Sequence, residues 1–283
     1  MNRSDRIFAE LLKPKLPSDD EYINPSDGLI YCKQCNTPRQ TTIHVPWSDK
    51  PYHPHVMCRC ESEKLKQQEA EEKSKAEQEE VKKLRSVGLQ DIILRSFTFE
   101  NDLGYNPQIA KAHKYVEHFD EMEKNGQGLL LWGDVGTGKT FMAGCIANAL
   151  LDRGLPVLMT NFSRVLMSLT SNIAEDKNAF LDGLDKFRLL VIDDLGIERN
   201  TDFALEQVFS VIDRRCQSNK PMIITTNLNL DELMNPKDLP HARIYDRVLS
   251  HCIPIRVNGS NIRKLQAKET LNSARSLLAE SYQ

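Results

Sequence analysis

The sequence predicts an α/β fold in which a five-stranded, mostly parallel sheet is covered by helices on both faces. Short apolar runs alternate with helical patterns such as residues 203–216, a rhythm typical of strands joined by crossover helices. Runs of this kind, short and apolar, indicate strands buried beneath helices. The five predicted strands are residues 128–133, 156–161, 188–196, 221–227 and 253–258.

Three regions of different composition divide the chain. Residues 61–87 consist almost entirely of Glu, Lys, Gln and Ala, with acidic residues four positions before basic ones, the favourable order on a helix. Apolar residues are too sparse there for a coiled coil. We therefore predict a charged helical linker over residues 61–88, between a small N-terminal module of residues 1–60 and a globular domain of residues 89–283.

Composition and charge argue against several classes of protein. The hydrophobic content of 40% is ordinary, and because the net charge is only −3, any contact with DNA has to be a local patch. The first residues lack the apolar segment of a signal peptide, and no run approaches the length of a transmembrane helix. We expect a cytoplasmic protein without a membrane partner.

A phosphate-binding motif follows the first predicted strand. The segment GDVGTGKT fits the pattern G-x-x-x-x-G-K-[ST] and precedes a helix, the context in which backbone N–H groups cradle phosphate oxygens. We expect Lys139 to reach the β- and γ-phosphates and Thr140 to ligate Mg²⁺. The predicted nucleotide-binding residues of the motif are Gly133, Asp134, Val135, Gly136, Thr137, Gly138, Lys139 and Thr140.

Two carboxylates end the strand 188–196, at the edge where sheets of this type bind ligands. We assign Asp193 to the Mg²⁺ shell and Asp194 to polarisation of the attacking water, which predicts a nucleoside triphosphate hydrolase. Asn227 ends the next strand and is expected to hydrogen-bond the γ-phosphate or the water. A turn-forming asparagine is the alternative for this position.

Three arginines complete the predicted site. Arg243 and Arg247 lie four residues apart on one predicted helix, from which one of them can reach the nucleotide of a neighbouring subunit. A solvated basic face is the alternative. Arg263 is a further candidate for contacting the nucleotide. The base is expected to be adenine, because residues 219–222, the nearest segment to a guanine-reading Asn-Lys-x-Asp element, lack the Asp.

Four cysteines near the N-terminus have the spacing of a metal site. A C-x-x-C pair and a C-x-C pair are separated by twenty-two residues, and two close thiolate pairs suit tetrahedral Zn²⁺. His53 and His55 are alternative ligands, and free thiols or a redox pair are the alternative to a metal. So small a module builds little apolar core, and we expect the metal to supply its fold. The predicted ligands are Cys32, Cys35, Cys58 and Cys60.

The order of the motifs in residues 89–273 resembles the DnaC/DnaI family of replicative helicase loaders, AAA+ ATPases related to the IstB transposition ATPases. The resemblance rests on RSFTFEND (95–102), GDVGTGKT, LLVIDDLG, TTN, RIYDR and GSNIR. It implies that Arg247, with Arg243 second, is an arginine finger and that Arg263 is the sensor 2 arginine. About twenty-five residues follow the last predicted strand, so we expect no full helical lid.

The resemblance also implies a function. We expect an ATPase that self-associates through its ATP site and delivers a hexameric DnaB-type helicase onto single-stranded DNA, with the cysteine module docked on the helicase. The alternative is an IstB-like ATPase that regulates transposition through duplex DNA, although the cysteine module and the linker argue against it. Residues 161–164 are candidates for a DNA contact, with ordinary helix capping by Ser163 beside a buried Phe162 as the alternative.

Overall fold

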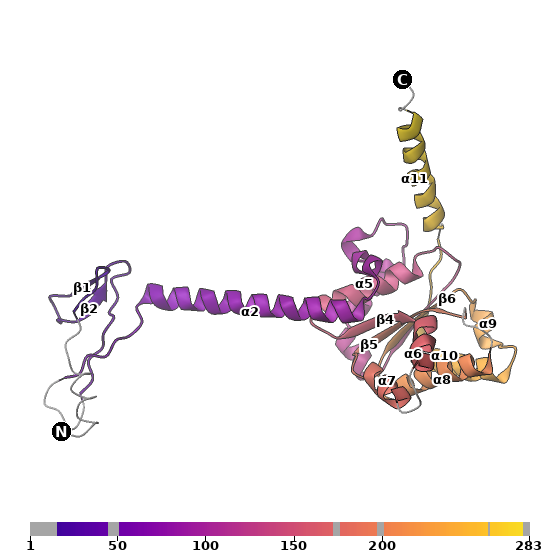
Figure 1. The fold of residues 1–283 in the computed structure, drawn as a ribbon, viewed down its shortest axis with the longest axis horizontal. Coiled ribbons are helices and arrows are strands. Elements are labelled where there is room, and N and C mark those ends of the chain that lie inside the picture. Colours follow the sequence, from indigo (N-terminus) through magenta and orange to yellow (C-terminus); the bar gives the residue numbers. More distant parts are fainter. Residues whose placement is uncertain (1–15, 45–50, 172–175, 197–200, 260, 280–283) are drawn as a thin grey trace. The chain divides into compact units, whose positions relative to one another are not determined.

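The computed structural model describes residues 16–44, 51–171, 176–196, 201–259 and 261–279 (Figure 1). The chain forms two compact units, Met1–Glu77 and Gln78–Gln283, and the boundary between them falls inside the helix α2, Arg59–Gly88. This helix begins two residues before the predicted linker, so its first turn includes Cys60. Within the described ranges, no helix combines the length and the apolar character needed to cross a bilayer.

A small hairpin organises the first unit. The strands β1, Glu21–Ile23, and β2, Ile30–Cys32, pair in antiparallel fashion, with Glu21 opposite Cys32. In the described part of residues 16–58, the buried hydrophobic side chains are those of Ile30, Cys32 and Cys58. Three side chains bury too little apolar area to hold a fold, so this unit depends on other interactions.

The helix α2 is a solvated element over most of its length. The ion pairs Lys73–Glu77 and Lys82–Glu79 within this helix are formed by strongly exposed side chains and contribute at most about 1 kcal/mol each. Only at its end does the chain become buried, where Leu89 is fully buried and forms a parallel bridge with Met159. The end of α2 is thereby fixed to the second unit.

A five-stranded sheet forms the centre of the second unit (Figure 1). The strand order is β4-β5-β6-β3-β7, and all four pairings are parallel, which confirms the predicted architecture. The order places β6 between β5 and β3, so the ends of these three strands lie next to one another. The strands are β3, Gly128–Trp132, β4, Val157–Asn161, β5, Leu189–Leu195, β6, Met222–Thr226, and β7, Cys252–Arg256.

Two apolar cores cover the faces of this sheet. Alternate residues of one strand enter different cores: Leu129 and Leu131 of β3 face one, and Leu130 faces the other. The first core packs against α3, Ile109–Glu117, α4, Phe119–Lys124, and α5, Lys139–Asp152. The second packs against α6, Phe162–Ser171, α7, Asp176–Leu184, α8, Asp202–Gln217, and α10, Leu239–His251.

Four further helices complete the described part of the second unit. A short helix α9, Leu230–Met234, follows β6 and begins with a capping box at Asn229. After β7, the described residues contain one helix, α11, Ile262–Ala279, in agreement with the prediction that a full helical lid is lacking. Two 3₁₀ helices, η1, Ile92–Ser96, and η2, Phe99–Asn101, precede the sheet.

The segment containing η1 and η2 is attached to α5 by specific contacts. The buried Asn148 amide donates hydrogen bonds to the carbonyl oxygens of Leu94 (2.8 Å) and Phe97 (3.0 Å). Gly144 of α5 leaves room for Phe97, because a Cβ at this glycine would lie 2.7 Å from the Phe97 Cβ. The motif at 95–102 is therefore held against the helix that begins at the phosphate-binding loop.

We predict that Gly144→Ala destabilises the second unit. The added methyl group overlaps Phe97 and has to displace it, and overpacking of this kind costs about 1–3 kcal/mol. Urea unfolding of the full chain measures the effect. Gly183→Ala in α7 is the matched control, because a Cβ there meets no atom within 4 Å, and it should leave stability unchanged or raise it. Equal stability of the two variants would contradict this packing.

Candidate functional site

The phosphate-binding loop joins β3 to α5, as the motif requires. Gly136 and Gly138 adopt positive φ values of 83° and 95°, a backbone conformation that residues with a Cβ rarely adopt. Gly138 is the residue that caps the N-terminus of α5, and Lys139 and Thr140 form its first turn. The free N–H groups of this turn carry partial positive charge, so the loop is suited to an anionic phosphate.

The side chain of Lys139, the first residue of α5, folds back onto the phosphate-binding loop. Its ammonium group donates hydrogen bonds of 2.8 Å to the carbonyl oxygens of Gly133 and Asp134, and the residue is only 5% exposed. Burial lowers the pKa of the Lys139 ammonium, while the neighbouring carboxylates of Asp194 and Asp193 oppose that shift. A charged ammonium is thus held at the place where a bound triphosphate would need it.

Asp193 lies near the end of β5, beside the start of α5. Its carboxylate accepts hydrogen bonds from the Thr140 hydroxyl, at 3.0 and 3.1 Å, and from the Thr225 hydroxyl, at 2.6 Å. Burial raises the pKa of the Asp193 carboxyl, the two threonine hydroxyls oppose this, and Asp194 adds to it. A hydroxyl and a carboxylate in contact are oxygen ligands that Mg²⁺ prefers, so Thr140 and Asp193 fit the predicted ion.

Asp194 occupies an irregular position in β5. Consecutive residues of a regular strand point to opposite faces, yet the pairing of β5 with β6 shifts between Ile192 and Leu195. Asp194 itself has a φ of 61°, a left-handed conformation that costs an ordinary residue roughly 1–2 kcal/mol. The bulge interrupts the regular alternation of β5 at the two carboxylates, and Asp194 lines the cavity described next.

A cavity of about 450 Å³ opens beside the loop, within the range of small-molecule sites. Its polar lining contains Lys139, Thr140, Asp194, Asn227 and Arg263, all singled out in the sequence. The structure thus gathers, at one site, residues from the start of α5, from β5, from the position after β6 and from α11. The roles of these residues in binding and hydrolysis stay predictions.

Apolar side chains form the other part of the cavity, and the sequence analysis missed them. They belong to the segment before the sheet, to α5 and to α11, and they offer a surface suited to a nucleotide base. Asn261 was also missed: its amide donates a 3.0 Å hydrogen bond to the Val135 carbonyl and so fixes α11 to the loop. The motifs at 95–102 and 259–263 were the available signal. The apolar lining includes Phe97, Leu103, Tyr105, Phe141 and Ile262.

The two finger candidates lie elsewhere in the chain. Arg247 forms an ion pair with Asp213 of α8, with 2.9 Å between Nε and Oδ1, and Arg243 stacks on the Phe209 ring at 4.2 Å from its centroid. Neither arginine is among the residues that line the described cavity of its own chain. The Arg247 side chain is 48% exposed, as a residue that acts on a neighbouring subunit has to be.

The DNA contact considered for residues 161–164 is not favoured by their packing. Phe162 is 2% exposed and belongs to the second core. The Asn161 side chain accepts a 2.9 Å hydrogen bond from the Arg164 N–H at the start of α6, and the Arg164 guanidinium pairs with Asp91. The packing therefore agrees with the alternative of a core Phe162, but the side chain that caps α6 is Asn161 rather than the expected Ser163.

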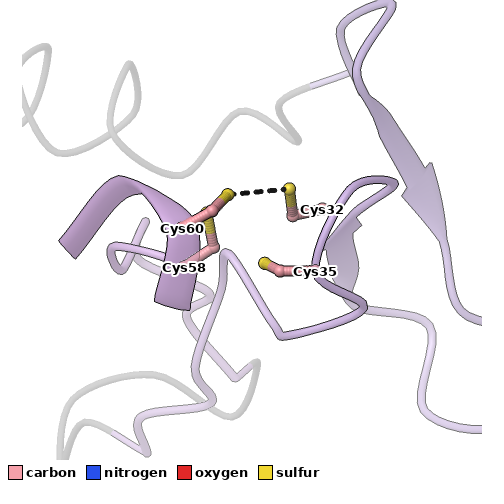
Figure 2. A group of neighbouring side chains, drawn as sticks. All are labelled: Cys32, Cys35, Cys58 and Cys60. Carbon is pink, nitrogen blue, oxygen red and sulfur yellow. Dashed lines mark hydrogen bonds between the residues drawn. The ribbon is translucent and has the colours of Figure 1, made fainter. Parts of the chain in front are cut away.

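The four cysteines meet in the first unit (Figure 2). Their sulfur atoms all lie within 4.8 Å of one another, with 3.6 Å between Cys32 and Cys60 and 3.3 Å between Cys58 and Cys60. Sulfur atoms around a tetrahedral zinc ion are about 3.8 Å apart, so the donor set fits this metal. Among the described residues, this is the group of side chains that could share an ion, and it includes neither His53 nor His55.

The surroundings of the cluster favour thiolates, the form that binds zinc. The Thr37 hydroxyl, 3.0 Å from the Cys35 sulfur, lowers the pKa of Cys35 to about 5. Backbone N–H groups of Cys35 and Gln34 lower the pKa of Cys32. By contrast, the neighbouring sulfur of Cys58 contributes most to raising the pKa of Cys60 to about 12. Hydrogen bonds to the neighbouring sulfurs thus favour the thiol form of Cys60, and a bound cation would favour its thiolate.

The sequence is similar to a family of ATP binding proteins and to two replicative helicase loaders. The sequence matches the family described as IstB-like ATP binding protein over residues 59–270. It is 27% identical to the replicative helicase loader DnaI of Bacillus subtilis over 279 residues, which cover 91% of this chain and 85% of that protein. It is 31% identical to the replicative helicase loader DnaC of Escherichia coli K12 over 143 residues, 50% of this chain and 56% of that protein.

A solved structure agrees with the fold. The crystal structure of DnaI superposes with a TM-score of 0.51 and 25% identity, covering 63% of this chain and 98% of that one. Together with the family match, this similarity confirms the resemblance to loaders and IstB-like proteins and the predicted class of AAA+ P-loop ATPase.

We predict about one zinc ion per chain, because the four-thiolate set leaves no position for another ligand. Elemental analysis of protein purified under reducing conditions measures it. Cys35→Ser should lose most of the metal, whereas Cys216→Ser, a cysteine of α8 outside the cluster, should keep it. Wild-type protein without metal under these conditions would refute the zinc site.

Proposed function

Because this chain belongs to the family of IstB-like ATP binding proteins, we propose that it is an ATP-dependent loader of a replicative helicase in the cytoplasm. It would deliver a hexameric DnaB-type helicase onto single-stranded DNA at the start of DNA replication. In this proposal, residues 1–60 dock on the helicase, residues 61–88 connect this module to the ATPase domain, and residues 89–283 hydrolyse ATP.

One observation carries the proposal. The match to the loader DnaI leaves 9% of this chain uncovered, about 25 residues, fewer than the 31 that precede Cys32. It therefore extends over all four cysteines, whereas the IstB-like family match begins at residue 59. A match that includes the N-terminal module favours a loader over the alternative, an IstB-like regulator of transposition that acts on duplex DNA.

The proposed ATP site uses the contacts at the strand ends. Lys139 stabilises the charge that develops on the γ-phosphoryl group, and Asn227 holds this group or the attacking water. Mg²⁺, bound by Thr140 and Asp193, would neutralise the β- and γ-phosphate oxygens. Asp194 orients and polarises the water, whose oxygen attacks the γ-phosphorus as the bond to ADP breaks. Arg263 contacts the phosphates from α11.

The proposed self-association brings Arg247 to the ATP of a neighbouring subunit. In the single chain this guanidinium is paired with Asp213, and its half-exposed side chain has to reach outward to act in another site. Hydrolysis then depends on assembly, since each subunit lacks part of its own site. Arg243 is the second candidate, stacked on Phe209 one turn earlier in α10.

The loading function predicts ATP-dependent transfer of the helicase. With ATP and circular single-stranded DNA, the chain should retain the host's DnaB-type helicase on the circle, measured by gel filtration. Lys139→Ala should lose both transfer and ATPase activity, because it removes the charge at the transferred group. Cys35→Ser should lose capture of the helicase and keep ATP binding. Lys124→Ala, an exposed lysine of α4, is the matched control.

Two outcomes would contradict this proposal. Capture of duplex DNA without capture of the helicase would favour the transposition regulator. Normal ATPase activity of Lys139→Ala, in a preparation free of contaminants, would overturn the assignment of the ATP site itself.

The proposed finger predicts a rate that rises faster than linearly with protein concentration. Arg247→Ala should bind ATP as the wild type does and lose hydrolysis by up to about 10³-fold. A mixture with Lys139→Ala should recover part of the activity, because that variant can still donate Arg247. Arg214→Ala is the matched control, since Arg214 is 46% exposed and also pairs with acidic residues. A mixture that assembles but stays inactive would move the finger to Arg243.

A further inference from the structure

Thr225 stands opposite the irregular part of β5. In the pairing of β5 with β6, Ile192 is opposite Ile224 and Leu195 is opposite Thr226. Two residues of β5, Asp193 and Asp194, therefore face a single residue of β6, which is Thr225. An arrangement of two residues against one is a β-bulge, and the ladder hydrogen bonds are interrupted at such a place.

The Thr225 hydroxyl takes over the interrupted contacts. It donates a hydrogen bond to Asp193 Oδ1 at 2.6 Å and accepts one from the Asp194 backbone N–H at 2.9 Å. A hydroxyl has one hydrogen to donate and lone pairs to accept, so it can serve both partners at once. One side chain thereby fixes the carboxylate of one aspartate and the backbone of the next.

Burial makes this arrangement sensitive to the hydroxyl. Thr225 is 0% exposed, so water has no access to replace the lost contacts if the hydroxyl is removed. Asp193 would keep the hydrogen bonds from Thr140, but the left-handed backbone of Asp194 would lose the partner of its N–H. Asp194 would then be free to relax toward a regular strand, with its carboxylate turned away from the cavity.

The neighbouring threonine provides a comparison within the same strand. Thr226 is also 0% exposed, and its hydroxyl donates to the Leu195 carbonyl at 2.7 Å and accepts from the Leu228 N–H at 3.1 Å. Its partners are backbone groups alone, and it contacts neither aspartate. Both threonines are therefore buried and both donate and accept one hydrogen bond, but only the Thr225 hydroxyl binds the two aspartates.

We propose that Thr225 is a positioning residue of the ATPase, which sets the direction of the Asp193 carboxylate and holds the bulge that aims Asp194 at the nucleotide. The inference rests on the roles proposed above for the two aspartates. It adds a residue that touches neither nucleotide nor metal ion and acts through both carboxylates.

The test compares Thr225→Val with Thr225→Ser in the full chain. Valine has nearly the same shape without the hydroxyl, and the turnover number should fall about 10- to 100-fold, as for loss of a hydrogen bond to an ionised group. The KM for ATP should change by less than about threefold, since the phosphate loop is untouched. The Mg²⁺ concentration for half-maximal rate should rise. Serine should restore turnover to within about threefold of wild type.

Two controls separate positioning from stability. Thr226→Val loses an equally buried hydroxyl and should lower the melting temperature without changing the Mg²⁺ dependence. Asp193→Asn and Asp194→Asn report on the roles of the aspartates themselves. If both keep wild-type turnover, the proposed roles are wrong and this inference falls with them.

If the aspartate variants lose turnover while Thr225→Val, like Thr226→Val, lowers only the melting temperature, the role of Thr225 is overturned and the proposed roles of the aspartates remain. Failure of serine to rescue the valine variant would overturn it too, because the hydroxyl would then not be the group that matters.

Discussion

Asp193 accepts hydrogen bonds from Thr140, 53 residues earlier in the chain, and from Thr225, 32 residues later. These contacts join the first turn of α5, the end of β5 and the end of β6 into one edge. The arrangement depends on the strand order, because β6 lies between β5 and the strand that leads into the phosphate-binding loop. Every polar group proposed for hydrolysis in the single chain is attached to this edge or faces it.

The cavity beside this edge is closed by segments from outside the sheet. Phe97 and Tyr105 come from the chain before β3, and Ile262 comes from the helix after β7. Two of these segments are held by contacts of their own: Asn148 and Gly144 hold the segment of Phe97, and a 2.9 Å hydrogen bond joins the Ile262 N–H to the Gly136 carbonyl. This explains physically why motifs at both ends of the domain accompany the phosphate-binding loop.

The first unit has much less apolar core than the second unit. The ATPase unit buries two apolar layers, whereas the described part of residues 16–58 buries few apolar side chains, and two of them are cysteines. Its polar contacts are correspondingly prominent. Arg39 pairs with Glu21, whose side chain is 5% exposed, and Glu21 lies opposite Cys32 in the hairpin. The Ser18 backbone N–H and Arg39 hold the pKa of Glu21 at about 2, despite its burial. The cluster of four cysteines, which fits a zinc ion, and this ion pair together take the place of an apolar core.

Local sequence determined the strands, the phosphate-binding loop and the two cysteine pairs, because each is a pattern of residue type and spacing over a few positions. It identified Asp193 and Asp194 as well, but regular alternation along a strand would have sent them to opposite faces. Only the pairing of β5 with β6 reveals the bulge at Asp194 and the hydroxyl of Thr225 beneath it. The same holds for Arg247, whose partner Asp213 lies on another helix. Register between strands and packing between helices are set by contacts across long sequence separations, so the tertiary structure alone decided which side chains meet.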